Sequence, residues 1–381
     1  MKVLVAPDKF KGSLSAKQVA SAIKKGIVRA MPNAVVEVCP MADGGEGMVE
    51  ALLESLDGKR KEVVVTGPMG EKVNKAGYGI LPGSIAAIEM SSAAGLWMVP
   101  EGKRNPMLAT TYGVGELIRD ALAEGVKKII LGIGGSATND GGTGMAKALG
   151  VRFISDHGEE LGYGGQILAR IRKIDMRGLD AGMRNVEILA ACDVTNPLYG
   201  ENGAAYVYAP QKGANSKMIR ELDDGLRNFA WVIKNDLGMD VADIPGAGAA
   251  GGIGAGLVAF LGARLIPGVE IVAETVGLRE KMRGADVVVT AEGKIDGQTL
   301  SGKTPFGVAR IAKEMGIPVI AFAGSVKEDA HSFHDNGIVA MFSISDGPIS
   351  LDESMKKAEE LLERSAEEVF RLMNLNLSVK R

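Results

Sequence analysis

The chain has 381 residues, which is more than one hydrophobic core usually holds, so we expect two domains. Its formal net charge is -3 and its lysines and arginines are scattered along the sequence, which argues against nucleic acid as a partner. The two cysteines, Cys39 and Cys192, form no CxxC pair. This argues against a disulfide framework and a zinc site and predicts two buried thiols.

The N-terminal segment predicts a strand followed by a helix. Lys2–Ala6 is β-branched and apolar, and it lacks the basic head and cleavage site of a signal peptide, so we expect a cytoplasmic protein. Ser15 and Gln18 have the spacing of a capping box at the start of an apolar stripe of period i+4, and Pro32 ends that stripe.

Short β-branched runs alternate with helical stretches along most of the chain. This alternation is typical of βαβ units and predicts an α/β fold with a parallel sheet. The predicted strands are Val3–Ala6, Val35–Cys39, Glu62–Thr66, Ile129–Gly132, Glu187–Ala191, Asp286–Thr290, Val319–Ala323 and Ile338–Phe342. A final helix is predicted over Asp352–Asn374.

The pattern changes between Glu62 and Ile88, where extended pieces are joined by turns of Gly and Pro, as in an antiparallel hairpin. The parallel pattern resumes near Asp286. We therefore predict a discontinuous domain of residues 1–63 and 282–381, interrupted by an inserted α/β domain of residues 64–281.

The uncharged segment Ile244–Ala263 contains the GxxxG spacing of membrane helix pairs. Seven of its residues are glycine, and its hydropathy is too weak for a membrane span. We expect a glycine-rich loop that leads into a buried helix from about Gly252.

Residues 297–304 match the P-loop pattern GxxxxGK[ST], but the context does not fit a P-loop. Six residues, Ala291–Asp296, separate the pattern from its strand, and Pro305 disfavours helical geometry at Thr304. We expect Thr304 to cap a helix that begins at Pro305 and Lys303 to be available to a phosphate.

Gly132–Ala137 fits the dinucleotide pattern GxGxxA and is followed by Asp156. However, Thr138–Gly142 delays the next helix to about Thr143, which makes the turn too long for a pyrophosphate. An NAD-dependent hydroxy-acid dehydrogenase is therefore only an alternative.

The segment Gly132–Gly144, which we call the glycine loop, nevertheless predicts anion binding. Its small residues let backbone amides approach a ligand, ahead of a helix N-terminus. Gly134 and Gly135 provide amides, and Ser136, Thr138 and Asn139 provide neutral polar groups. Asp140 adds a carboxylate suited to Mg²⁺. A purely structural loop is the alternative.

Polar residues also follow four other predicted strands, at the sheet edge where open α/β sheets bind ligands. With nearby lysines they form a set suited to phosphoryl transfer, in which carboxylates bind metal and amines neutralise charge. The set comprises Asp8, Lys9, Lys11, Asp43, Glu46, Asp193, Thr195, Asn196, Lys212, Glu292, Asp296 and Lys303. The three histidines, His157, His331 and His334, lack ligand spacing and are expected at the surface.

Eight segments together resemble the bacterial type I glycerate kinases, the family that includes the glycerate 2-kinases. These segments are Ala6–Ser13, Met41–Gly47, Gly134–Gly142, Ala191–Leu198, Pro210–Gly213, Pro245–Gly252, Glu292–Thr299 and Gly302–Pro305. The resemblance implies a Rossmann-like domain interrupted by a second α/β domain. It also implies ATP and Mg²⁺ as cofactors, glycerate as acceptor and 2-phosphoglycerate as product.

On this basis we predict the site residues and the alternatives. We expect glycerate in a cleft between domains, with Lys9 or Arg104 at its carboxylate and Asp193 as base or hydroxyl-orienting group. A kinase of another small sugar acid and a non-catalytic nucleotide sensor are alternatives, and a homo-oligomer is compatible with the sequence. The full set is catalytic Asp193, Lys9 and Asp43; substrate-binding Arg104, Ser92, Asn196 and Lys212; nucleotide- or phosphate-binding Gly134, Gly135, Ser136, Thr138, Asn139 and Lys303; and metal-binding Asp140, Glu46, Glu292 and Asp296.

Overall fold

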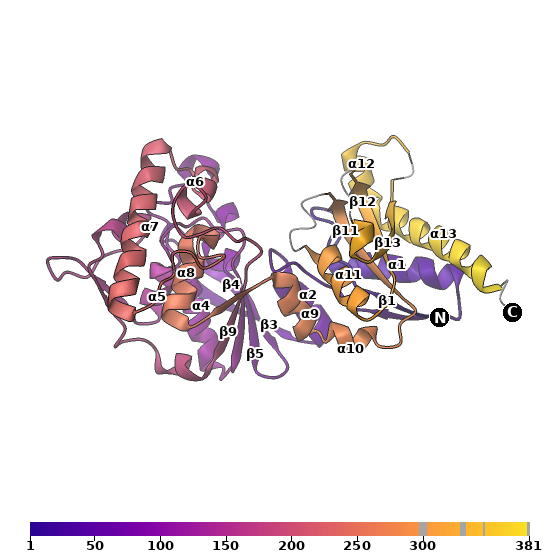
Figure 1. Ribbon diagram of the computed structural model, residues 1–381, viewed down its shortest axis with the longest axis horizontal. Helices are drawn as coiled ribbons and strands as arrows, with labels where there is room; N and C mark the ends of the chain where they lie inside the picture. Colours follow the sequence, from indigo (N-terminus) through magenta and orange to yellow (C-terminus); the bar gives the residue numbers. More distant parts are fainter. Residues whose placement is uncertain (297–302, 328–332, 346, 379–381) are drawn as a thin grey trace. The chain divides into compact units, whose positions relative to one another are not determined.

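The computed structural model describes residues 1–296, 303–327, 333–345 and 347–378. The chain divides into two compact units (Figure 1). Unit 1 comprises Met1–Asp43, Glu50–Leu56 and Val269–Arg381, and unit 2 comprises Gly44–Val49 and Asp57–Gly268.

Unit 1 contains a five-stranded sheet in the order β13-β12-β11-β1-β2, in which every neighbouring pair is parallel. The central strand β1 is buried at Val3, Leu4 and Val5, as expected where helices cover both faces of a parallel sheet. The parallel sheet predicted from the alternating pattern is confirmed. Its strands are β1 (Lys2–Val5), β2 (Val35–Val38), β11 (Val287–Ile295), β12 (Val319–Val326) and β13 (Ile338–Ser343).

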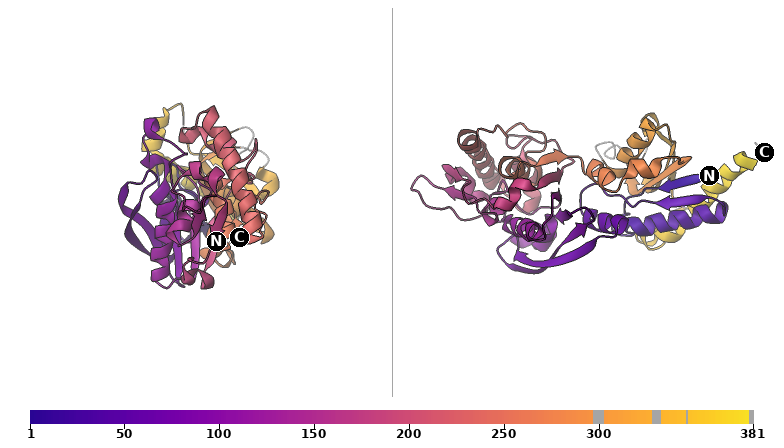
Figure 2. Two further views of the ribbon diagram at one scale, coloured as in Figure 1. Left: turned by 90° about the vertical axis from the view of Figure 1, so that its left-hand side faces the viewer. Right: turned by 90° about the horizontal axis from the view of Figure 1, so that it is seen from below.

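Helix α1 (Ala16–Ala30) begins with the predicted capping box of Ser15 and Gln18. It lies alongside the C-terminal helix α13 (Ala358–Ser378), seen as the indigo and yellow helices in the right-hand view of Figure 2. A Cβ atom at Gly26 would overlap the backbone of α13, so a glycine is needed for this close packing.

The predicted single C-terminal helix is wrong in one respect. The structure contains α12 (Leu351–Lys356) and α13, separated at Lys357. Ser350 caps α12 by accepting a hydrogen bond from the Glu353 amide. The remaining helices assigned wholly or partly to unit 1 are α2 (Met48–Leu56), α9 (Gly268–Thr275), α10 (Leu278–Met282) and α11 (Thr304–Glu314).

Unit 2 contains a six-stranded sheet in the order β10-β9-β6-β5-β4-β3. The first three strands in sequence, β3 (Lys59–Thr66), β4 (Lys72–Leu81) and β5 (Ile85–Glu89), pair antiparallel, as predicted for this region. The other pairs are parallel and involve β6 (Lys128–Gly132), β9 (Glu187–Ala191) and β10 (Arg264–Ile266). Because the whole of β3 pairs with β4, unit 2 starts earlier than the expected limit at residue 64.

The helices of unit 2 pack around three phenylalanines, Phe153, Phe229 and Phe260, whose ring centroids lie 5.6 to 6.4 Å apart. This cluster belongs to a core that is separate from the core of unit 1. The α-helices are α3 (Ser91–Ala94), α4 (Tyr112–Ala123), α5 (Thr143–Ala148), α6 (Ala204–Tyr208), α7 (Ser216–Leu237) and α8 (Ala249–Leu261).

The uncharged segment Ile244–Ala263 contains helix α8. Ala250, Gly251 and Gly252 have positive φ angles, so regular helical geometry begins after Gly252, as predicted. No helix in the described part of the chain is long and apolar enough to cross a membrane. Cys39 and Cys192 are both buried free thiols, also as predicted.

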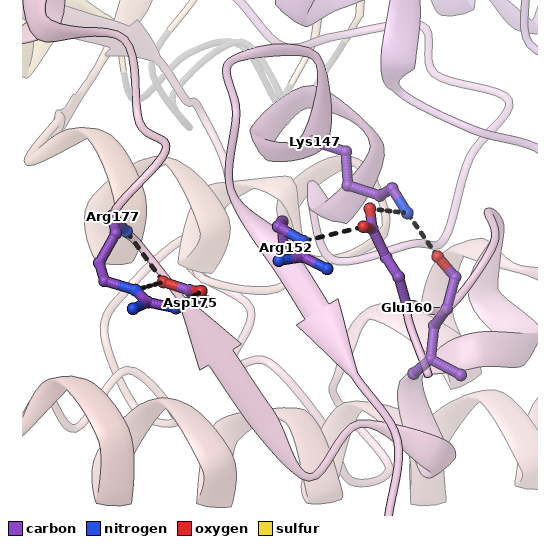
Figure 3. Close-up of polar contacts among 6 residues, drawn as sticks. Lys147, Arg152, Glu160, Asp175 and Arg177 are labelled. Carbon is purple, nitrogen blue, oxygen red and sulfur yellow. Dashed lines mark hydrogen bonds and ion pairs between the residues drawn. The ribbon is translucent and has the colours of Figure 1, made fainter. Parts of the chain in front are cut away.

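A small hairpin of β7 (Arg152–Ile154) and β8 (Lys173–Asp175) carries several ion pairs (Figure 3). Glu160 pairs with both Lys147 and Arg152, at 3.1 and 2.9 Å, and Lys147 also donates to the Leu161 carbonyl oxygen. These contacts tie the loop after β7 to helix α5. The exposed pairs each contribute only about 0–1 kcal/mol, so the role is local positioning.

Candidate active site

Several predicted site residues line a pocket of about 390 Å³ in unit 2, which we call the unit 2 pocket. It lies at the carboxyl ends of β6 and β9, the edge at which ligands bind in open α/β sheets. The predicted residues in its lining are Gly134, Gly135, Ser136, Asp193 and Lys212. The other lining residues are Gly44, Gly45, Leu96, Ile133, Ala191, Cys192, Val194, Tyr208, Gln211, Ala249 and Ala250.

The glycine loop forms one wall of this pocket and is held by the segment that follows β5. The Leu96 amide donates to the Gly135 carbonyl oxygen at 2.8 Å, and Ser136 forms a bridge with Gly95. Gly135 has a φ of 71°, which disfavours residues with a side chain. The backbone of the loop thus faces the pocket at Gly134 and Gly135, as an anion-binding turn requires.

Lys212 crosses the base of the loop and is 2% exposed. Its Nζ donates to Ser136 Oγ at 2.7 Å and to the Thr138 carbonyl oxygen at 2.6 Å. Burial lowers the pKa of Lys212 to about 7, while the negative charge of Asp140 acts in the opposite direction and is the smaller effect. When it is protonated, the Lys212 amine can hold a negatively charged group of a ligand in the pocket.

Asp193 follows β9 and is exposed at the pocket. Its carboxylate accepts a hydrogen bond from the Gly268 amide at 2.9 Å, which fixes its orientation. Its neighbour Cys192 is buried, and this burial raises the pKa of the thiol. Cys192 is therefore a neutral wall of the pocket at neutral pH.

Three predicted ligand-binding residues of the glycine loop, Thr138, Asn139 and Asp140, lie inside unit 2 and not in the pocket lining. The Asp140 carboxylate accepts hydrogen bonds from the amides of Thr111, Gly142 and Gly144 and from the Thr111 hydroxyl. Burial raises the pKa of Asp140, and these bonds oppose that effect. This bonding makes Asp140 a structural residue of the loop.

Thr138 and Asn139 are fully buried, and neither the Thr138 hydroxyl nor the Asn139 amide group has a hydrogen-bond partner among the described residues. Buried polar groups of this kind are normally satisfied by a partner or an ordered water. Their predicted contact with a nucleotide has no support from this placement.

The other predicted substrate-binding residues are outside the lining of the unit 2 pocket. Arg104 donates to the carbonyl oxygens of Val99 and Gln211, at 3.3 and 3.4 Å. Asn196 accepts from the Tyr208 hydroxyl at 2.6 Å, and the Ser92 hydroxyl donates to the Glu89 carbonyl oxygen at 2.8 Å, at the end of β5. Of these, Asn196 and Arg104 each bond a residue that lines the pocket, Tyr208 and Gln211 respectively.

Four further predicted residues, Lys9, Asp43, Glu292 and Lys303, line a second pocket of about 500 Å³, the unit 1 pocket. The pocket thus brings together residues that follow β1 and β2 with Glu292, which lies within β11 because that strand continues to Ile295, beyond its predicted end at Thr290. One wall of this pocket is apolar. The remaining lining residues are Asp8, Phe10, Lys11, Ser13, Gly293, Lys294, Gly324, Ser325, Ile344, Leu351, Ser354, Met355 and Ala358.

Asp8 also lines this pocket; it belongs to the predicted phosphoryl-transfer set but not to the predicted catalytic or binding residues. Its two oxygens accept hydrogen bonds from the Lys9 amide and the Thr304 hydroxyl. Burial and then the neighbouring Asp43 raise the pKa of Asp8 to about 7, while those two bonds act in the opposite direction. Its position at the end of the first strand was the available signal.

Helix α11 begins at Thr304, and Lys303 is the N-cap residue. The prediction that Thr304 would be the cap is therefore wrong by one residue. Its fully buried side chain serves instead to bond Asp8. The rest of the P-loop pattern, residues 297–302, lies outside the described residues, as does His331. His157 and His334 are exposed, as predicted.

The unit 1 pocket contains one carboxylate oxygen suited to a cation. Lys303 pairs with Glu292 Oε1 at 3.1 Å, whereas Glu292 Oε2 is buried and has no hydrogen-bond partner among the described residues. Burial raises the pKa of Glu292. Asp296 pairs with Lys294 at 2.6 Å, and Glu46 is exposed in unit 2.

No group of three histidine, cysteine, aspartate or glutamate side chains in the described ranges is arranged to hold a metal ion. Mg²⁺ bound to a nucleotide needs only one or two carboxylates, because phosphates and waters complete its coordination. The unpartnered oxygen of Glu292, with Asp43 in the same pocket, fits that smaller requirement.

The comparisons with known proteins agree with one another. A model of the glycerate kinase family matches residues 3–374. A glycerate kinase of Halalkalibacterium halodurans is 52% identical over 99% of both chains, and a glycerate 2-kinase of Escherichia coli K12 is 49% identical over 97% of both. A crystal structure described as "putative glycerate kinase 2" from Salmonella typhimurium LT2 has a TM-score of 0.91 at 46% identity and covers 99% of each chain.

Proposed function

This chain belongs to the glycerate kinase family, and we propose that it transfers the terminal phosphoryl group of ATP to the 2-hydroxyl group of glycerate. Kinase activity on glycerate with ATP is the activity of the family. The finer elements of the proposal are the 2-phosphoglycerate product, the use of Mg²⁺ and the roles of individual residues. The observation that carries these roles is that the buried amine of Lys212 and the exposed carboxylate of Asp193 both line the unit 2 pocket.

We propose that the unit 2 pocket binds glycerate. It contains Lys212, whose amine is suited to a carboxylate, and the amides of Gly134 and Gly135 with the Ser136 hydroxyl. Asp193 would accept or orient the reacting hydroxyl. Phosphoryl transfer depends mainly on orientation and charge neutralisation, and a carboxylate fixed by a backbone amide supplies the first of these.

We propose that the unit 1 pocket binds the magnesium nucleotide. Lys9 and Lys303 would neutralise phosphate charge, and Glu292 and Asp43 are the carboxylates available to the metal. When bound, Mg²⁺ supplies charge neutralisation to the phosphates. The apolar wall that includes Phe10 suits the nucleoside part of the ligand.

One coupled assay tests the activity. With Mg-ATP, we expect ADP release that depends on glycerate, and enolase alone should convert the product to phosphoenolpyruvate. A requirement for a mutase would identify the 3-phosphate instead. Turnover only with a different sugar acid, or a nicotinamide change without ATP, would support the alternative enzymes, and ATP binding without any turnover would indicate a sensor.

The metal is tested by removal. A chelator should abolish turnover and added Mg²⁺ should restore it.

We also propose a cytoplasmic location, where both substrates are available, and cell fractionation tests it. A homo-oligomer stays a prediction that light scattering can check.

A further inference from the structure

Lys212, which lines the unit 2 pocket, is almost completely buried. It ends a short 3-10 helix, Pro210–Lys212, and the next residue, Gly213, has a φ of 92°. A Cβ at Gly213 would overlap the backbone of Arg104, so the turn can be made only by glycine. The backbone therefore directs the lysine side chain inward and holds it there.

The amine has neutral partners at both of its hydrogen bonds, the Ser136 hydroxyl and the Thr138 carbonyl oxygen. Neither acceptor compensates a full positive charge removed from water. Charged and titratable groups face it from several elements. They are Asp140 from the glycine loop, Cys192 and Asp193 after β9, Tyr208 from α6 and Arg104, which donates to the neighbouring Gln211 carbonyl oxygen.

Compared with the groups that face it, Lys212 is the one expected to change its charge near neutral pH. Burial raises the pKa of Cys192 and Tyr208, so both stay neutral. Asp140 already accepts four hydrogen bonds, two from Thr111 and two from the amides of Gly142 and Gly144. Burial brings the pKa of Lys212 to about 7. An arriving anion would reverse that effect, because an opposite charge favours the protonated amine.

We propose that glycerate binding to the unit 2 pocket is coupled to the uptake of one proton by Lys212, which supplies the countercharge to the substrate carboxylate. This inference rests on the proposed function, since it assumes that glycerate is the ligand of this pocket. In the empty pocket at mildly alkaline pH the amine is neutral, and the bound carboxylate draws a proton onto it. Substrate affinity is then set by the protonation of one buried side chain.

Linkage gives the size and direction of the effect. At about pH 6 the amine is already protonated, so binding takes up almost no proton. At about pH 8 it is mostly neutral, so binding takes up close to one proton, and the Kd for glycerate rises about tenfold between these pH values. Glycerate itself does not contribute, because its carboxyl group stays ionised across this range.

Titration calorimetry on the wild-type protein tests this directly. Glycerate is titrated into the enzyme at each pH in two buffers of different ionisation enthalpy, and the difference in heat gives the number of protons taken up. Uptake that rises from near zero to near one supports the proposal. Absence of uptake at both pH values overturns it.

Two variants assign the proton. Lys212→Met should abolish the uptake and make the weakened binding independent of pH, whereas Lys217→Met, on an exposed lysine nearby, should keep the wild-type profile. Uptake that persists in a folded Lys212→Met protein would assign the proton to another group, such as Asp140, and overturn the proposal. If Lys212→Met does not fold, the wild-type measurement still decides.

A turnover assay on the same preparation separates the two proposals. Glycerate that is phosphorylated but bound without proton uptake overturns the coupling and leaves the proposed function intact. If glycerate is neither bound nor phosphorylated, the proposed function fails and the coupling fails with it.

Discussion

The amine of Lys212 and the hydroxyl of Ser136 are joined by a 2.7 Å hydrogen bond inside unit 2, although 75 residues separate them in the sequence. This bond holds the amine of Lys212, a titratable group of the unit 2 pocket, against the glycine loop. Ser136→Ala removes one of the two acceptors of the amine and favours its neutral form.

We expect Ser136→Ala to lower kcat/KM for glycerate about tenfold at neutral pH, equivalent to about 1.4 kcal/mol, the typical value of one such hydrogen bond. The loss should grow as the pH rises. Steady-state kinetics measure it, and Ser216→Ala, at an exposed helix start in the same unit, is the matched control. Unchanged kinetics in Ser136→Ala would show that the bond has no role in substrate binding.

Asp193→Asn tests the proposed base or orienting group. The amide oxygen of asparagine can still accept from the Gly268 amide, so we expect normal folding. Loss of the carboxylate should lower kcat by about a hundredfold or more with a smaller change in KM, because general base catalysis contributes 10²–10⁴-fold. Nearly full kcat with glycerate and Mg-ATP would refute the assignment.

Asp8→Asn should stabilise the protein at alkaline pH. The pKa of Asp8 is raised to about 7 from an ordinary value of 3.8, so its ionisation penalises the folded state fully above about pH 7 and not below about pH 4. Asparagine stays neutral and can bond both the Lys9 amide and the Thr304 hydroxyl. We expect the free energy of unfolding to rise by about 4 kcal/mol at pH 8.

Urea denaturation at both pH values measures this change. An equal gain at pH 4 and pH 8 would contradict the explanation by charge, and a loss of stability at pH 8 would show that the ionised form is favoured in the folded protein.

Asp140→Ala should destabilise the protein, because it leaves the buried amides of Thr111, Gly142 and Gly144 without an acceptor. Each unsatisfied donor costs about 1–3 kcal/mol, and the removal of a buried carboxylate offsets part of the total, so we expect a net loss of about 2–4 kcal/mol. Asp156→Ala, at an exposed position, is the control. A stable Asp140→Ala protein with altered Mg²⁺ dependence would instead favour a metal role.

Local features of the fold could be predicted because neighbouring residues determine them. The capping box of Ser15 and Gln18 acts within one helical turn, and the alternation of β-branched and helical segments correctly predicted parallel strands in both sheets. The start of regular helix after Gly252 followed from the flexibility of glycine. In the same way, Asp8, Lys9, Asp43 and Glu292 share the unit 1 pocket because β1, β2 and β11 run parallel in one sheet; Asp8, Lys9 and Asp43 follow β1 and β2, and Glu292 lies in the C-terminal half of β11.

In the glycine loop, the sequence did not predict which residues face the pocket and which are buried. The sequence by itself identified the loop and, through its resemblance to glycerate kinases, the family and the activity. Only the tertiary structure decided that Gly134, Gly135 and Ser136 face the pocket while Thr138, Asn139 and Asp140 turn inward. Those directions depend on Thr111 and Lys212, which the fold brings to the loop from other elements, and so does the electrostatic environment that controls the charge on Lys212.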